Sequence, residues 1–96
     1  MGVSDGGAEG EFTVRSLLGL HARPAGRFVA LAGRFDSEVE VSRGEEWVSG
    51  TSVLSILSLA AAEGTVLRIK AQGEDAARAV AALGELVEAM EALDEE

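Results

Sequence analysis

Apolar residues in this chain recur at two different spacings, and these spacings restrict the fold more than any other feature of the sequence. In three segments every second residue is apolar, as in strands that bury one face. These segments cover residues 11–16, 38–43 and 65–71. After the middle segment, a Gly44-Glu45 turn and residues 46–49 complete a predicted β-hairpin. The spacing therefore predicts four strands.

Three other segments predict helices. Residues 22–35 and 74–93 repeat apolar residues every three or four positions, which gives each helix one buried stripe. Residues 52–63 predict a shorter, largely apolar helix that Gly64 ends. The order β-α-β-β-α-β-α can bury one face of a sheet under three helices, so the predicted class is α+β with two layers. This class serves many functions, so the fold alone does not identify one.

The length of 96 residues suits a single domain. Residues 1–10 are rich in glycine and acidic, so we expect a flexible tail before one domain that spans residues 11–96. No apolar run is long enough to cross a bilayer, and the first residues do not resemble a secretory signal. Cysteine is absent, which excludes disulfides and thiolate metal sites. We therefore expect a cytoplasmic protein that does not insert into membranes.

Charge is unevenly distributed along the chain. Acidic residues outnumber Lys and Arg by 17 to 8, and the net charge of −9 makes nucleic acids and anionic membranes poor partners. Residues 12–35 nevertheless contain four arginines and no acid: Arg15, Arg23, Arg27 and Arg34. The last three fall on one side of the predicted helix. A basic ridge on an acidic chain predicts one site that receives an anion or an acidic partner.

The single histidine of the chain lies at the start of a predicted helix. Proline is tolerated in the first turn of a helix, so Pro24 places His21 near the N-cap. The first-turn N–H groups of Ala22, Arg23 and Ala25 then have no carbonyl partner within the helix and attract an anion. The guanidinium of Arg23 matches the oxygens of a phosphate. We therefore expect an imidazole, a helix N-terminus and an arginine to converge on one small anion.

The residues alone leave two interpretations of His21. Near pH 7 an imidazole is largely neutral and nucleophilic, so it could accept a phosphoryl group and form a phosphohistidine. Arg23 and the helix N–H groups would stabilise the charge of that group. Alternatively, His21 is only a helix cap. A single imidazole without thiolates does not make a zinc site, so we expect no metal and no other cofactor.

The apolar arc of the predicted helix over residues 52–63 is wider than a surface helix needs. It covers about 220°, whereas one buried stripe takes about 100°. Six residues form it: Val53, Leu54, Ile56, Leu57, Leu59 and Ala60. Part of the arc is therefore either a docking surface or a second buried side. Thr51 and Ser52 can cap this helix with their hydroxyl groups.

From Glu11 to Leu93 the chain resembles HPr, the histidine-containing phosphocarrier of the bacterial phosphoenolpyruvate-dependent phosphotransferase system. The resemblance is carried by Gly-Leu-His-Ala-Arg-Pro-Ala at residues 19–25 and by Ser-Val-Leu-Ser-Ile-Leu-Ser-Leu at residues 52–59, followed by Gly64. It implies an open-faced β-sandwich, in which three helices cover one face of a four-stranded antiparallel sheet.

The resemblance also implies a function. His21 would accept a phosphoryl group on Nδ1 from phosphorylated enzyme I and pass it to enzyme IIA domains for sugar uptake, while Arg23 steadies the group. The carrier is then not itself an enzyme, because its partners supply the catalysis, and we expect it to be a monomer. Ser52 matches the regulatory serine of the family, which adds HPr kinase/phosphorylase as a candidate partner. Four residues match the docking surface of the family: Arg27, Val53, Leu54 and Leu57. The resemblance then implies that the core contains Ile56, Leu59 and Ala60.

Several alternatives stay open. Gly50-Thr51 precede Ser52 where relatives carry leucine and lysine, so Ser52 could serve only as a helix cap. A regulatory relative of HPr, in a nitrogen branch or in signalling, would use the same histidine chemistry on targets other than sugar transporters. A protein-interaction module that is never phosphorylated, or a small-ligand sensor, would not use that chemistry at all.

Overall fold

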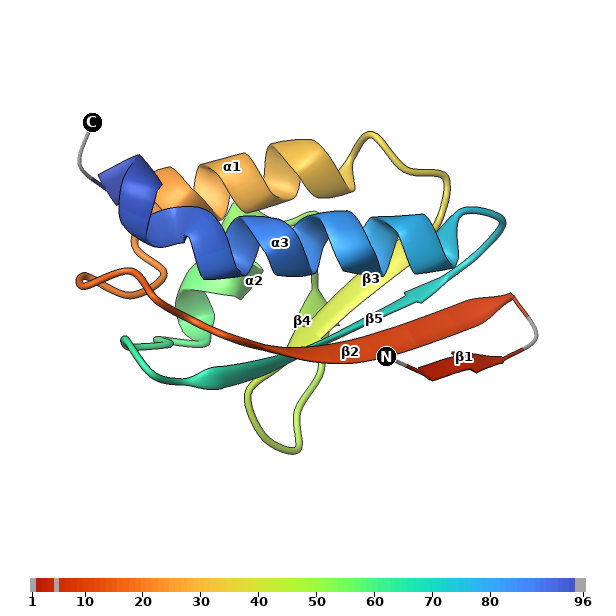
Figure 1. Cartoon of the computed structure of the whole chain (residues 1–96), viewed down its shortest axis with the longest axis horizontal. Helices are drawn as coiled ribbons and strands as arrows, with labels where there is room; N and C mark the ends of the chain where they lie inside the picture. Colours follow the sequence, from red (N-terminus) through yellow and green to blue (C-terminus); the bar gives the residue numbers. More distant parts are fainter. Residues whose placement is uncertain (1, 5, 95–96) are drawn as a thin grey trace.

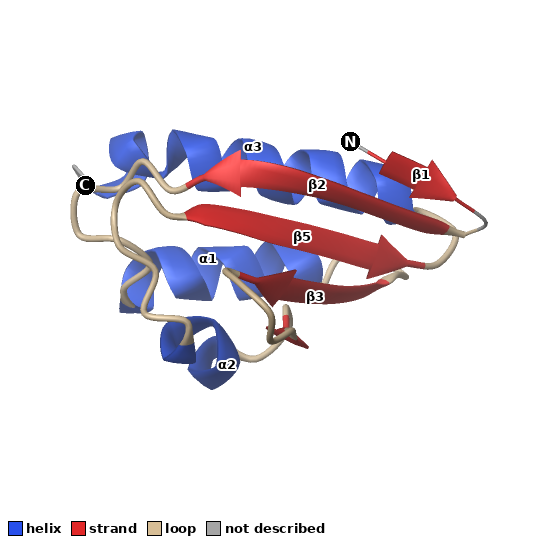
Figure 2. Ribbon diagram, turned by 90° about the horizontal axis from the view of Figure 1, so that it is seen from below, coloured by secondary structure: helices blue, strands red, loops and turns tan. Residues whose placement is uncertain are grey.

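The computed structural model describes residues 2–4 and 6–94, which form a five-stranded antiparallel sheet and three helices (Figure 1). All three helices cover the same face of the sheet (Figure 2). The sheet order is β1-β2-β5-β3-β4. Along the chain the elements are β1 (Gly2–Ser4), β2 (Gly7–Thr13), α1 (Ala22–Ala32), β3 (Glu38–Ser42), β4 (Val48–Ser49), α2 (Val53–Ser58), β5 (Val66–Gln72) and α3 (Ala76–Asp94).

The central strand β5 shows why the sequence folds this way. Its apolar residues Leu67, Ile69 and Ala71 are buried, whereas the intervening Arg68 and Lys70 are only half-buried. Successive side chains of a strand point to opposite faces, so the period of two directs every apolar residue toward the helices. The predicted two-layer α+β class, with four antiparallel strands under three helices, is confirmed, and the structure adds a fifth strand at one edge.

This fifth strand corrects the predicted start of the domain. β2 begins at Gly7 rather than at residue 11, and β1 pairs with it so that Gly2 lies opposite Glu9 and Ser4 opposite Gly7. Residues 2–4 and 7–10 therefore belong to the sheet and do not form a tail outside it. Residues 1 and 5 lie outside the described part of the chain. The sequence signal for this hairpin is Asp5-Gly6, a dipeptide that favours two-residue turns between strands.

α1 and α3 are slightly shorter than their predicted ranges. α1 ends at Ala32 with Gly33 as its C-cap, so Arg34 lies beyond the helix and not on its basic face. α3 begins at Ala76 rather than at residue 74, because the Asp75 carbonyl accepts the first helical hydrogen bond, from the Ala79 N–H. The buried stripe of α3 is nevertheless the one predicted as far as residue 87. The side chain of Met90 is outside the described part.

The uncovered face of the sheet carries charged side chains around one tryptophan. The Lys70 ammonium lies 4.0 Å and the Arg68 guanidinium 4.8 Å from the ring centre of Trp47. Arg68 also pairs with Glu9 at 2.7 Å, and Lys70 pairs with Glu40 at 3.6 Å. An antiparallel sheet can leave one face in water when its side chains there are polar, so this face needs no further layer.

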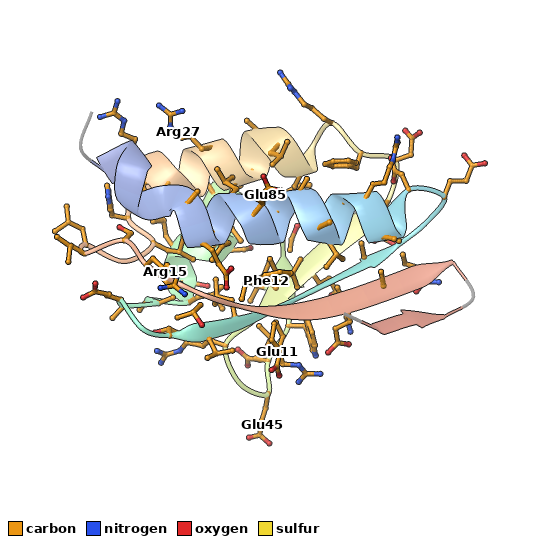
Figure 3. All side chains as sticks on the ribbon, in the orientation of Figure 1. Glu11, Phe12, Arg15, Arg27, Glu45 and Glu85 are labelled. Atoms are coloured by element: carbon orange, nitrogen blue, oxygen red, sulfur yellow. The ribbon has the colours of Figure 1, made fainter. Side chains whose placement is uncertain are left out.

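A glycine on α3 makes room for an aromatic ring of the sheet. Phe12 points from β2 toward α3, whereas its neighbour Glu11 points away from the helices (Figure 3). A Cβ atom added at Gly84 would collide with the Phe12 ring. Gly84 therefore sets the distance at which α3 can pack against β2. Gly26 in α1 differs, because a Cβ atom added there would meet nothing within 4 Å.

Replacing these two glycines with alanine should have opposite effects on the free energy of unfolding. We expect Gly84→Ala to lower the free energy of unfolding by about 1–3 kcal/mol, since the added methyl group overpacks the Phe12 site. We expect Gly26→Ala to raise it by up to about 1 kcal/mol, since alanine loses less backbone entropy in a helix. Urea unfolding of both variants measures the effects. A Gly84→Ala protein as stable as the wild type would contradict the packing argument.

Candidate functional site

The loop before α1 is fixed by hydrogen bonds to a segment distant in sequence. The Leu20 N–H donates to the Ala61 carbonyl at 2.9 Å. The Val14 carbonyl accepts from the Gly64 N–H at 2.8 Å, and the Val14 N–H donates to the Thr65 carbonyl at 2.9 Å. Leu20 itself is buried in the core. These hydrogen bonds therefore hold both ends of the loop, and with it the start of α1.

Gly19 is required at this place for two reasons. Its φ of +71° lies in the left-handed region, which favours glycine. A Cβ atom at Gly19 would also collide with the Ala61 carbonyl oxygen. The glycine of the Gly-Leu-His motif thus allows the loop to approach residues 61–62 and to turn His21 into position at the helix start.

His21 is the N-cap residue of α1, as predicted. Its backbone is extended, with φ −85° and ψ −174°, and its carbonyl accepts from the Ala25 N–H at 3.0 Å. The imidazole is half-buried and makes no capping hydrogen bond to the first turn, which argues against the interpretation of His21 as a cap. The prediction that the Ala25 N–H lacks a helical partner is wrong. The N–H groups of the first turn that come before the first helical donor, the Ala25 N–H, are those of Ala22 and Arg23.

Two arginines lie on the exposed side of α1. Arg23 and Arg27 are both exposed and one helical turn apart, whereas Pro24 is buried under the first turn. Arg15, also exposed, lies before the helix and at the same end of the molecule (Figure 3). This end therefore combines an imidazole, a helix N-terminus and three cationic side chains, a combination suited to an anion.

The second helix is shorter than predicted but presents the predicted apolar residues. Ser52 is its N-cap, and its Oγ accepts from the Ser55 N–H at 3.2 Å. Leu54 is 79% exposed and Val53 is exposed to a lesser extent, whereas Leu57 is half-buried against the core. Of the three docking residues predicted in α2, two are therefore exposed and one packs partly against the core.

The predicted end of this helix, and the predicted burial of one residue, are wrong. α2 ends at Ser58, and Ala60 is exposed with a left-handed φ of +48°. Ile56 and Leu59 are buried as expected. The helix stops early because residues 61–65 form hydrogen bonds with the loop before α1, and these tertiary contacts override the helical pattern of the sequence.

Two exposed residues of this region, Leu17 and Leu18, are not among the predicted site residues. They are 71% and 73% exposed and directly precede the Gly-Leu-His motif. Their signal was a pair of leucines between a predicted strand and a glycine, where a turn normally has polar residues. Among residues 6–89, whose side chains the structure describes, no group of three or more potential ligands could hold a metal ion. In the described part of the chain, no helix is long and apolar enough to span a bilayer.

Known proteins resemble this chain over most of its length. Residues 8–89 match the family model described as PTS HPr component phosphorylation site. The chain is 44% identical over 78 residues to the phosphocarrier protein HPr of Pseudomonas aeruginosa, covering 80% of this chain and 87% of that protein. It is 38% identical over 81 residues to the phosphocarrier protein NPr of Shewanella violacea, covering 84% and 89%.

A solved structure agrees with these matches. The crystal structure of a phosphocarrier protein HPr from Bacillus anthracis str. Ames superposes with a TM-score of 0.82 at 32% identity, covering 86% of this chain and 99% of that one. Fold and relatives together define a small phosphocarrier protein of the phosphotransferase system. Within that class, the chain belongs to the HPr family.

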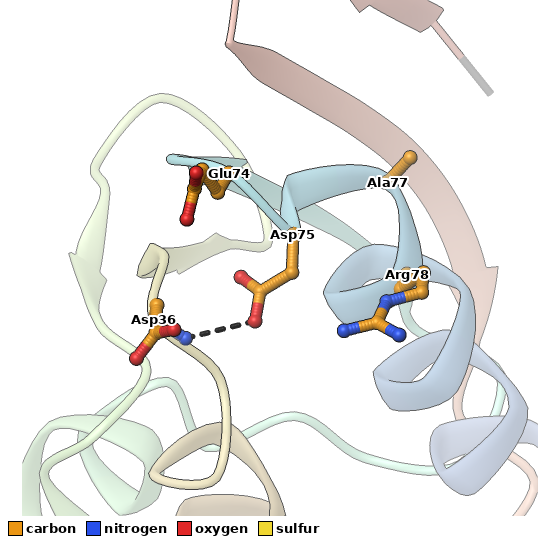
Figure 4. A pocket seen from close by; sticks show the side chains of 5 residues that line it. All are labelled: Asp36, Glu74, Asp75, Ala77 and Arg78. Carbon is orange, nitrogen blue, oxygen red and sulfur yellow. Dashed lines mark hydrogen bonds between the residues drawn. The ribbon is translucent and has the colours of Figure 1, made fainter.

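The opposite end of the molecule has a different polar cluster. The Asp75 carboxylate accepts from the Asp36 N–H at 2.9 Å (Figure 4). It also accepts from the Ser37 hydroxyl at 2.6 Å. Asp36, Glu74, Asp75 and Arg78 line a hollow there. The hydrogen bond from Ser37, followed by that from Asp36, lowers the pKa of Asp75 below its ordinary value of 3.8. The carboxylate joins the loop after α1 to the start of α3, so its role is structural.

This cluster predicts a pH-dependent contribution to stability. The pKa of Asp75 is lower in the folded state than in the unfolded state, so ionised Asp75 stabilises the fold above its ordinary pKa. Asp75→Ala should therefore be less stable than the wild type at pH 7, and the difference should shrink as the pH falls below the ordinary aspartate value of 3.8. Urea unfolding at several pH values measures this difference.

Asp36→Ala is the matched control, because Asp36 donates its backbone N–H and not its carboxylate to Asp75. It should retain the pH dependence of the wild type. A stability difference between wild type and Asp75→Ala that is constant from pH 7 to the acid range would contradict the assignment.

Proposed function

We propose that the protein carries a phosphoryl group on His21, which it receives from phosphorylated enzyme I and delivers to enzyme IIA domains. The observation that supports this most directly is the position of His21 at the N-cap of α1, where a helix N-terminus and the exposed Arg23 and Arg27 lie at the same end of the helix. Membership of the HPr family supports the same conclusion.

The chemistry requires one nucleophile and a site that tolerates negative charge. In the first transfer the bond between phosphorus and the donor breaks while a P–N bond to His21 forms, and in the second this P–N bond breaks while phosphorus bonds to the acceptor's nucleophile, so the phosphoryl group is conserved. The resemblance to HPr assigns Nδ1 of His21 as the nitrogen that bonds phosphorus. The N–H groups of Ala22 and Arg23, at the positive end of the α1 dipole, would face the phosphoryl oxygens, and the Arg23 guanidinium would add a cation.

The partners supply the rest of the catalytic machinery, so the protein acts as a carrier and not as an enzyme. The same face has to bind a donor and then an acceptor, and each complex must be weak enough to separate. Val53 and Leu54 provide exposed apolar area beside the site, and Arg27 extends its positive charge. Acidic groups and an apolar recess on each partner would complement this face.

A second candidate is a regulatory phosphocarrier with the same histidine chemistry. The similarity to a protein named NPr, at 38% identity over 84% of this chain, supports this second candidate. The two candidates differ only in the acceptor. Incubation of the phosphorylated protein with purified sugar-specific and regulatory IIA domains, followed by phosphate analysis of each acceptor, distinguishes them.

The histidine assignment predicts a specific mass change. Incubation of the wild type with phosphoenolpyruvate and enzyme I should add one phosphoryl group, about 80 Da, that acid removes and base does not. His21→Ala should gain no mass, while its thermal unfolding stays close to that of the wild type because the imidazole does not cap α1. Intact-mass spectrometry and circular dichroism measure both effects.

Ser52→Ala is the control for the site of modification. It should gain the same acid-labile mass, although loss of the cap should cost about 1 kcal/mol of stability. An acid-stable gain that disappears in Ser52→Ala would instead identify Ser52 as the residue that is modified in this incubation. Full labelling of His21→Ala would refute the proposed carrier function. A wild type that is never labelled would favour an interaction module.

A further inference from the structure

The two leucines before the Gly-Leu-His motif occupy the corners of a β-turn. The Gly19 N–H donates to the Ser16 carbonyl at 3.0 Å, which makes Leu17 and Leu18 the two central residues of the turn. Ser16 is fully buried, whereas Leu17 and Leu18 are 71% and 73% exposed. The Leu17–Leu18 turn therefore projects its two apolar side chains into solvent.

Folding does not account for leucine at these positions. Central turn residues are usually glycine, proline, asparagine, aspartate or serine, each for a conformational or hydrogen-bonding reason. Exposed leucines add little to the core and expose apolar surface to water. Departures from such local rules are expected where a residue serves function rather than stability. The described residues include only a few other large apolar side chains that are exposed, and two of these, Val53 and Leu54, belong to α2 beside the site.

The turn is rigidly supported, which suits a contact surface. Hydrogen bonds from Leu20 to Ala61 and between Val14 and residues 64–65 hold the loop on both sides of the turn. A contact that is ordered before binding loses less conformational entropy when a partner binds. Leu17 and Leu18 therefore form a preorganised apolar protrusion.

The position of the turn indicates what covers it. It lies at the end of the molecule where α1 begins and where α2 is located (Figures 1 and 2). A protein that brings a phosphoryl group to His21 must occupy this end. Arg15 precedes the turn and Arg23 follows it, so the surroundings are basic and favour an acidic protein surface. The net charge of −9 disfavours an anionic bilayer as the occupant.

We propose that the Leu17–Leu18 turn is a second docking contact for the phosphorylated donor, enzyme I, in addition to Val53 and Leu54. The inference rests on the proposed carrier function and adds to it a binding determinant. The donor surface would provide an apolar recess for the two leucines, next to acidic groups that face Arg15 and Arg23.

The test replaces both leucines with serine, a residue that turns favour. We expect Leu17→Ser with Leu18→Ser to raise the KM for phosphorylated enzyme I about tenfold, because the apolar area that binding would bury is lost. The kcat, the thermal stability, and direct labelling of His21 by the small donor phosphoramidate should stay unchanged. Val66→Ser is the matched control, since Val66 is 47% exposed on β5 and should leave the KM unchanged.

Each outcome decides between occupants. An unchanged KM in a folded double variant would overturn the docking role while leaving the carrier function intact. Binding of the wild type to phosphatidylcholine vesicles, lost in the double variant together with an unchanged KM, would identify a membrane as the occupant. Self-association of the wild type that the double variant loses, again with an unchanged KM, would identify a second copy. A wild type that neither phosphoramidate nor enzyme I can label would refute the carrier function itself.

Discussion

The placement of His21 depends on backbone hydrogen bonds between two loops that are distant in sequence. One loop leads from β2 into α1, and the other leads from α2 into β5. Leu20 bonds to Ala61 at 2.9 Å, and Gly64 bonds to Val14 at 2.8 Å. Side-chain packing alone would leave the helix start free to shift along the sheet, whereas these directional bonds fix where the N-cap lies. The positive φ of Gly19 is the conformational requirement that allows the loops to approach.

This arrangement confines the residues of the proposed site to one end of the molecule. The helix N-terminus, the arginines of α1 and the exposed apolar residues of α2 lie together there, whereas the opposite end holds the hydrogen-bonded Asp75 cluster and the added β1–β2 hairpin. The open face of the sheet is covered by paired charges around Trp47. A basic and apolar end on an otherwise acidic protein can orient the carrier toward acidic partners before contact.

The sequence predicted the features that depend on local periodicity. The alternation in β5 and the stripe of α3 identified their buried faces, and Pro24 placed His21 at the N-cap because proline restricts where a helix can start. The early end of α2 could not be predicted, since it follows from hydrogen bonds to a loop about 40 residues away in the chain. The burial of Leu57 depends on how α2 tilts toward the core, which apolar spacing does not specify.

Two further features escaped prediction for different reasons. The glycine-rich composition of residues 1–10 suggested a tail, but pairing with an existing sheet stabilises strands that would not form alone. The exposure of the two turn leucines could not be predicted, because hydropathy assigns leucine to the core. Only the structure shows which leucines are exposed.

The central claim is that the first turn of α1 binds the phosphoryl group carried by His21. The most direct measurement is a ¹H–¹⁵N correlation spectrum of the protein before and after phosphorylation by enzyme I. We expect downfield shifts of the amide protons of Ala22 and Arg23, since each would donate to a phosphoryl oxygen. The Ala79 N–H at the start of α3 donates to the Asp75 backbone carbonyl at 2.9 Å, and its chemical shift should stay unchanged. Phosphorylation that leaves the amide shifts of Ala22 and Arg23 unchanged would contradict the account.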